Sequence, residues 1–263
     1  APHVKRSGSI RFGGSRLEEL DQLTGSQRIG VVQQSPENQG VTDKVWHELA
    51  FGLESLGYDT PTIRRRVAEM ASFFGIQTWF YKNVTELSGG QKQLLNLASS
   101  RAMQPSVLIL DEPTSQLDPI AASDFLATLG KINRELGTTV ILTEHRLEEA
   151  FPLSDTAAVL DRGRVVCTGT PAQVGAKLRD GGHAMFLAMP TAMRVWAAVQ
   201  SDGDCPVTVR EGRGWLERVA AENPLQNVPP EEEHTCPDEP AITVGDLWFR
   251  YDKELPDVVR GLK

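Results

Sequence analysis

Apolar residues recur along the chain at two spacings, which predict strands and helices in alternation. The unbroken run from Val107 to Leu110 is typical of a parallel strand in the centre of a sheet with both faces covered. Two further strands are expected from Arg28 to Gln33 and from Thr138 to Thr143, the second rich in β-branched residues. Strands separated by helical segments in this way predict a fold of the α/β class.

Three segments between these strands carry apolar residues at helical spacing, so each presents one apolar stripe. The first helix is expected after Thr42 as its cap, and the second from Thr60 as N-cap to Gly75, with Pro61 at N1. The third is expected to end before Gly137. The stripes consist of Val45, Leu49, Leu53 and Leu56; of Ile63, Val67, Met70, Ala71 and Phe74; and of Phe125, Leu129, Ile132 and Leu136. The first two helices predict a helical subdomain.

The stretch LSGGQ predicts a helix start that can receive an anion. Ser88 and Gln91 have the spacing of a capping box, in which each side chain bonds the other residue's backbone N–H. Gly89 and Gly90 let the backbone approach a ligand closely, and the free N–H groups with the helix dipole favour a negative charge. A phosphate group would fit there, although Ser88 taken alone is equally a simple helix cap.

Two adjacent carboxylates, Asp111 and Glu112, follow the expected central strand. Ligands of open α/β sheets bind at the carboxyl ends of the strands. Side by side, these two negative charges would repel each other, which implies a cation at the site. Taken alone, Asp111 is equally a turn residue.

LSGGQ followed by LILDEPTSQLD resembles the signature motif, Walker B strand and D-loop of ATP-binding cassette (ABC) ATPases. The resemblance implies ATP and Mg²⁺ as ligands, with Asp111 holding the metal through water and Glu112 acting as general base. It also implies that Asp118 couples two sites, but Asp118 before Pro119 is a good N-cap and N1 pair as well, and both roles stand. The residues expected to cap the γ-phosphate of a nucleotide on an opposing cassette are Ser88, Gly89, Gly90 and Gln91.

Two further positions resemble functional positions of this family. Gln34, in QSPENQ, resembles the glutamine that senses the metal and the attacking water, with Gln33 as its rival and a solvated loop amide as the alternative for both. His145, in TEHRLEEA, resembles the switch histidine that contacts the γ-phosphate, although a lone histidine is usually structural. The aromatic residues expected either to contact a membrane subunit or to pack in the core are Trp46, Trp79, Phe80 and Tyr81.

Composition narrows the possible partners. The 263 residues carry a net charge of −8, which disfavours a nucleic-acid partner, because backbone phosphates are met by clustered Lys and Arg. Three cysteines without CxxC spacing predict free thiols and no zinc site. No apolar run reaches transmembrane length and no signal peptide is found, so a membrane role is expected to be by docking.

The phosphate-binding string GxxxxGK[ST] occurs nowhere in the sequence. Because APHVKRSGSIRFGG resembles the stretch after the phosphate-loop helix, we expect a truncated P-loop NTPase-like cassette lacking Walker A at 1–178, with a helical subdomain about 41–105. The alternative is a degenerate cassette. An interdomain linker is expected at 179–240, with two short helices and an acidic Pro-rich segment, and the start of a second cassette at 241–263.

In that second cassette Tyr251 would be the aromatic residue that stacks on adenine, with strand packing as its alternative. The short strand expected at Ser9 to Phe12 would have an open edge. We expect residues 242–262 to pair there, the alternative being a C-terminal segment separate from that sheet.

The layout resembles tandem ATPases of energy-coupling-factor importers. This implies an ATP-hydrolysing subunit at the cytoplasmic face of the membrane, peripheral, with a transmembrane subunit and a second cassette in the same protein as partners. The chain alone is expected not to turn over ATP. The alternative is a tandem ABC ATPase acting on ribosomes, against which stand the final Gln of LSGGQ, the Glu144–His145 pair and the acidic linker.

Overall fold

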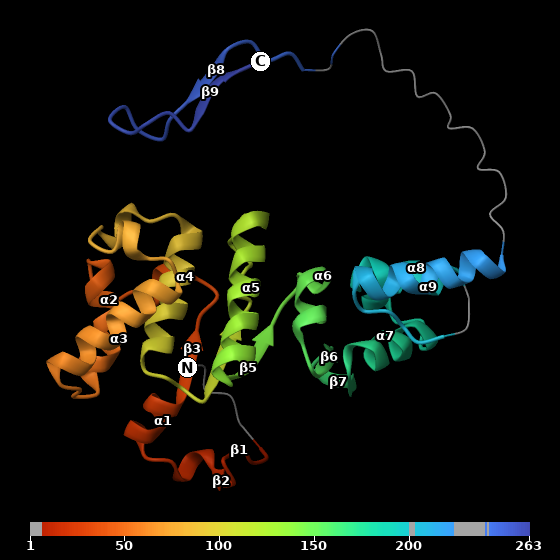
Figure 1. Ribbon diagram of the computed structural model, residues 1–263, viewed down its shortest axis with the longest axis horizontal. Coiled ribbons are helices and arrows are strands. Elements are labelled where there is room, and N and C mark those ends of the chain that lie inside the picture. Colours follow the sequence, from red (N-terminus) through yellow and green to blue (C-terminus); the bar gives the residue numbers. More distant parts are fainter. Residues whose placement is uncertain (1–6, 200–202, 224–239, 241) are drawn as a thin grey trace. The chain divides into compact units, whose positions relative to one another are not determined.

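A computed structural model describes residues 7–199, 203–223, 240 and 242–263. The chain divides into two compact units, 1–219 and 220–263, which are described separately (Figure 1). Three features of the sequence lie wholly or largely outside the described residues: the start of APHVKRSGSIRFGG, most of the acidic Pro-rich segment, and Cys236. None of the described helices has the length and apolar character needed to cross a membrane.

A parallel three-stranded sheet is the centre of the first unit. Its strands are β3 (Ile29–Val32), β4 (Val107–Asp111) and β5 (Thr139–Thr143), in the order β3-β4-β5. The predicted central position of the Val107 to Leu110 run is confirmed, and β5 forms one edge of this sheet.

The two faces of this sheet differ, because side chains alternate along a strand. Leu108 and Leu110 are fully buried on one face. On the other face Val31, Ile109 and Ile141 stand side by side in register and are 50%, 36% and 53% exposed. The expectation that both faces are covered is therefore not met within the described part of the chain.

A helical subdomain packs on the buried side of the sheet. It contains α2 (Val45–Ser55), α3 (Thr60–Phe73) and α4 (Gly89–Ala102), and Figure 1 shows α2 and α3 in orange beside α4. The predicted stripes pack in one core, where Val45, Leu49 and Leu53 are fully buried. α5 (Pro119–Leu136) packs against α4 and ends, as predicted, at Gly137 in the left-handed conformation.

Two predicted helix caps are wrong. The N-cap of α2 is Lys44, because the Thr42 hydroxyl instead donates to the carbonyl of Lys44 and lies 2.9 Å from a carboxylate oxygen of Glu48. The N-cap of α3 is Asp59, one residue before the predicted Thr60, so Pro61 lies in the first turn at N2 rather than N1.

The remaining elements of the first unit are short or lie after the sheet. Before the sheet come β1 (Arg11–Phe12), β2 (Ser15–Arg16) and α1 (Gln22–Arg28). After it come α6 (Leu147–Ala150), β6 (Ala157–Asp161), β7 (Arg164–Gly169), α7 (Pro171–Asp180), α8 (Thr191–Val199) and α9 (Val209–Glu222). Single 3-10 turns occur at Leu17–Glu19, Pro36–Asn38, Gln77–Trp79, Val84–Glu86, Phe151–Leu153 and Ala184–Ala188.

A second core joins α7 to the segment that follows it. Trp196 of α8 and Trp215 of α9 are buried against Val174 and Leu178 of α7. Burial in this core raises the pKa of the Cys205 thiol to about 11. Residues 184–219, placed in the expected linker, therefore contribute packed helices to the first compact unit.

The second unit contains one described hairpin, β8 (Leu247–Phe249) with β9 (Val259–Leu262). The strand pairing expected between residues 242–262 and the region of Ile10 is wrong. In the described part of the chain β8 pairs with β9, and β1 pairs with β2. Each strand finds its partner in its own neighbouring sequence, where the loop to be closed is short.

We predict that Gly30→Ala destabilises the first unit, because a Cβ at Gly30 would lie 2.7 Å from Leu108 Cδ2 and 3.2 Å from Pro105 Cγ. Such overpacking of a core costs about 1–3 kcal/mol in the free energy of unfolding. The measurement is chemical denaturation of the 263-residue chain.

The matched control is Gly40→Ala, since a Cβ at Gly40 meets no atom within 4 Å. Its free energy of unfolding should stay within about 0.5 kcal/mol of the unsubstituted chain. Equal stabilities of the two variants would contradict the packing described around Gly30.

Candidate active site

The start of α4 has the predicted capping box. Ser88 Oγ accepts from the Gln91 backbone N–H at 3.3 Å, and Gln91 Oε1 accepts from the Ser88 N–H at 3.0 Å. The first-turn N–H groups of Gly89 and Gly90 have no partner within the helix. A Cβ at Gly90 would lie 3.0 Å from the Cβ of Ala121 in α5, so this helix end leaves no room for a larger residue.

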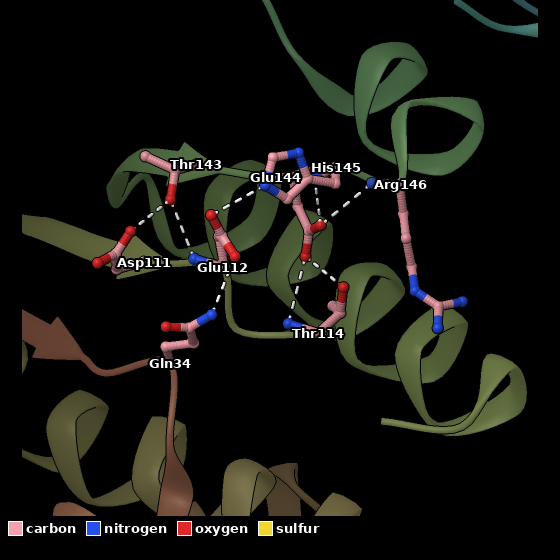
Figure 2. A network of polar contacts seen from close by, with 8 residues as sticks. All are labelled: Gln34, Asp111, Glu112, Thr114, Thr143, Glu144, His145 and Arg146. Atoms are coloured by element: carbon pink, nitrogen blue, oxygen red, sulfur yellow. Dashed lines mark hydrogen bonds and ion pairs between the residues drawn. The ribbon is translucent and has the colours of Figure 1, made fainter. Parts of the chain in front are cut away.

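At the end of β4 the hydroxyl of Thr143 holds both carboxylate residues. It donates to Asp111 Oδ1 at 2.7 Å and accepts from the Glu112 N–H at 3.0 Å (Figure 2). Glu112 has a φ of 41°, a left-handed conformation that is uncommon for residues other than glycine. Backbone strain of this kind persists where surrounding bonds fix it, as Thr143 does here, and it is frequent at functional sites.

The carboxylate of Glu112 brings together residues from three separate segments. Gln34 Nε2 donates to Oε2 at 3.0 Å, and His145 Nε2 lies 2.9 Å from Oε1 (Figure 2). Gln33, the rival of Gln34, is engaged differently: its backbone N–H donates to Gln39 and its carbonyl accepts from Gln93. The geometry therefore joins Gln34, and not Gln33, to Glu112.

Glu144, which lies between Thr143 and His145, links the two loops at the site. Its carboxylate accepts from the backbone N–H and hydroxyl of Thr114 and from the backbone N–H groups of His145 and Arg146. The positioning bonds of Thr143 and Glu144 were missed from the sequence. The Thr143 bond could have been found by pairing β4 with β5, because Asp111 lies opposite Thr143 in register.

Asp118 has its structural role in this geometry. Its carboxylate accepts from the N–H groups of Ile120 and Ala121, both at 3.0 Å, as the N-cap of α5. The N-cap prediction is confirmed, and coupling between two sites stays a prediction. Tyr251 belongs to the second unit, where it is 78% exposed with its ring centroid 5.2 Å from that of Phe249.

The four aromatic residues considered for a membrane-subunit surface divide into two groups. Trp79 is buried and Phe80 is half-buried against the core of the helical subdomain. Trp46 and Tyr81 are 41% and 80% exposed. Core packing therefore accounts for the first pair only.

A divalent cation fits the donor set at this strand end. Within the described residues, no group of three or more His, Cys, Asp or Glu side chains could hold a metal by itself. Asp111 is exposed and accepts a bond from Thr143 on one oxygen, and the amide of Gln34 donates through Nε2, which directs that nitrogen to Glu112. Mg²⁺ suits such a set, because it binds through one or two protein oxygens together with phosphate oxygens and water.

Comparison with known proteins agrees with the fold and the motifs. Residues 2–115 match the family model described as ABC transporter. A putative ABC transporter ATP-binding protein of Bacillus cereus is 40% identical over 263 residues, which cover 99% of this chain and 46% of that protein. The chain thus spans about half the length of such relatives. The energy-coupling factor transporter ATP-binding protein EcfA1 of Symbiobacterium thermophilum is 37% identical over 201 residues, covering 76% of this chain and 69% of that protein.

Two solved structures share the fold. One is cbiO1 from Clostridium perfringens, part of the ABC transporter complex cbiONQ, with a TM-score of 0.59, 30% identity and coverage of 69% of this chain and 75% of that one. The other is the ATP-binding cassette MJ0796 bound to ADP and Pi, with a TM-score of 0.55, 22% identity and coverage of 63% and 74%. The second shows the fold alone.

The parallel sheet, the capped LSGGQ helix and the carboxylates at the strand end recur here in a chain that resembles ATP-binding proteins over most of its length. The cassette is therefore of the P-loop NTPase type, and the chain belongs to the family of ABC transporter ATP-binding proteins, with relatives among those of energy-coupling factor transporters.

Proposed function

We propose that this chain forms part of the ATP-hydrolysing subunit of an energy-coupling factor importer. The observation that carries the proposal is the convergence of Gln34 and His145 on the carboxylate of Glu112, beside Asp111. A carboxylate held between an amide and an imidazole at the end of a central strand suits a base that acts on one bound water.

In the proposed mechanism Glu112 orients the attacking water and accepts its proton, while Gln34 and His145 keep the carboxylate aimed. His145 is well exposed, so its Nε2 could also contact a phosphate oxygen. Asp111 and Gln34 would hold Mg²⁺, which when bound offsets the negative charge that builds up on the phosphates.

The start of α4 is proposed to serve a different nucleotide. Ser88, Gly89, Gly90 and Gln91 would cap the γ-phosphate of an ATP held by an opposing cassette, through backbone N–H groups and the helix dipole. In this arrangement Asp118, at the start of α5, would couple the two sites. Tyr251 would stack on the adenine of the second cassette, which its high exposure permits.

A phosphate loop is the part that this proposal requires from outside the sequence. The string GxxxxGK[ST] does not occur among the 263 residues. Two features support completion of the site by further chain: the apolar face formed by Val31, Ile109 and Ile141, and the edge position of β5 in its sheet. We propose that the chain alone does not turn over ATP, because no group positions the γ-phosphate.

The proposed partners follow from exposure and charge. Trp46 and Tyr81 would contact a transmembrane subunit at the cytoplasmic face of the membrane, where the protein would be peripheral. A net charge of −8 argues against nucleic acid. The ribosome-acting alternative is not favoured by any feature of the site or by the names of the relatives above.

In a longer protein that joins this sequence to its phosphate loop, we predict that Glu112→Gln lowers kcat for ATP hydrolysis by about 10²- to 10⁴-fold, the usual contribution of a general base. Nucleotide binding should be retained, because the amide keeps the size of the carboxylate. Phosphate release and equilibrium ATP binding are the two measurements.

Glu135→Gln provides the control for that variant, since Glu135 is an exposed residue of α5 outside the site. It should hydrolyse ATP at the rate of the unsubstituted protein. Hydrolysis left unchanged by Glu112→Gln would remove Glu112 from the role of base.

For the 263-residue chain alone we predict no steady-state phosphate release from ATP above that of buffer. The reason is that proximity and orientation of the γ-phosphate supply a large part of the catalysis. Turnover by the chain that disappears on Glu112→Gln would overturn this prediction.

A further inference from the structure

We propose that Glu144 is a positioning residue that holds the backbone of His145 against the loop carrying Glu112. The proposal rests on the function proposed above, because it assigns Glu144 a task in the same reaction. No role follows for Glu144 from the motifs themselves, in which it is only the neighbour of the histidine.

The carboxylate of Glu144 bonds two loops, one with each oxygen. Oε1 accepts from Thr114, at 3.2 Å from the backbone N–H and also from the hydroxyl. Oε2 accepts from the backbone N–H of His145 at 2.8 Å and from that of Arg146 at 3.2 Å (Figure 2). A bridge of this form needs two acceptor oxygens, which an amide side chain does not have.

The two ends of the bridge differ in mobility. Thr114 is fully buried, so it offers a fixed anchor in the loop after Glu112. The side chain of His145 is 79% exposed and is held by little packing, so its place depends on its backbone and on its contact with Glu112. Glu144 therefore transfers the fixed position of Thr114 to the imidazole.

Two other bonds join the same loops, and neither acts directly on His145. Thr143 bonds Asp111 and Glu112 at the strand end, and the guanidinium of Arg146 donates to the carbonyl of Leu117 at 3.1 Å. Glu144 is the residue of this set that bonds the backbone of the histidine itself.

The first test is Glu144→Gln in the longer protein with its phosphate loop. The variant keeps the side-chain length but loses the acceptors for one loop, so we expect kcat to fall about tenfold or more, since small misplacements of a reacting group cost up to that order or beyond. KM for ATP should change little, because Glu144 bonds protein groups and would not touch the nucleotide.

The second test reads the histidine directly in the 263-residue chain, without ATP. Long-range ¹H–¹⁵N spectra of the imidazole should show a His145 Nε2 signal that Glu112→Gln shifts, because that substitution changes its partner. Glu144→Gln should shift the same signal in the same direction. Thr114→Val, which removes the hydroxyl donor but keeps the shape of the side chain, should give a smaller shift of the same sign.

Glu148→Gln is the matched control. Its carboxylate likewise accepts from a backbone N–H and a hydroxyl, those of Thr191 at 2.8 and 3.0 Å, but it joins α6 to α8 away from the site. It should leave both kcat and the His145 signal unchanged.

The outcomes separate this proposal from the proposed function. A longer protein that does not hydrolyse ATP at all would sink the function, while the spectra would still decide the position of His145. Glu144→Gln with unchanged kcat and an unshifted His145 signal would overturn the positioning role. If Glu144→Gln does not fold, Thr114→Val decides: a shifted His145 signal supports the bridge, and an unshifted one defeats it.

Discussion

The parallel register between β4 and β5 is the constraint on which the site depends. It places Asp111 opposite Thr143, so one hydroxyl bonds the carboxylate of the first strand and the next backbone N–H. Shifting one strand by a single residue would turn every side chain to the other face. The strained backbone of Glu112 and the nearby histidine both follow from this one pairing.

The chain holds residues for two different tasks on opposite sides of α4 and the sheet. The strand ends carry a carboxylate, an amide and an imidazole already in contact, while the start of α4 offers N–H groups and a helix dipole. Both are organised without any ligand. The cost of ordering these side chains is therefore met during folding, which is what preorganised electrostatic catalysis requires.

Locally encoded features were predictable from the sequence, and features that depend on register were not. The capping box of Ser88 and Gln91 and the cap at Asp118 each lie within four residues, so spacing alone predicts them. The choice of Gln34 over Gln33 and the bridge made by Glu144 depend on how distant segments meet. The packing of α8 and α9 on α7 was also missed, because their segment was interpreted as linker from its composition.

The central claim is that Glu112, with Gln34 and His145, faces the γ-phosphate once a phosphate loop is supplied. The most direct measurement is a crystal structure of a longer protein containing this sequence and its phosphate loop, bound to Mg²⁺ and a non-hydrolysable ATP analogue. The account predicts the carboxylate of Glu112 within hydrogen-bond reach of a water in line with the γ-phosphate, with the Nε2 of His145 beside a phosphate oxygen. A γ-phosphate that lies away from both side chains would contradict it.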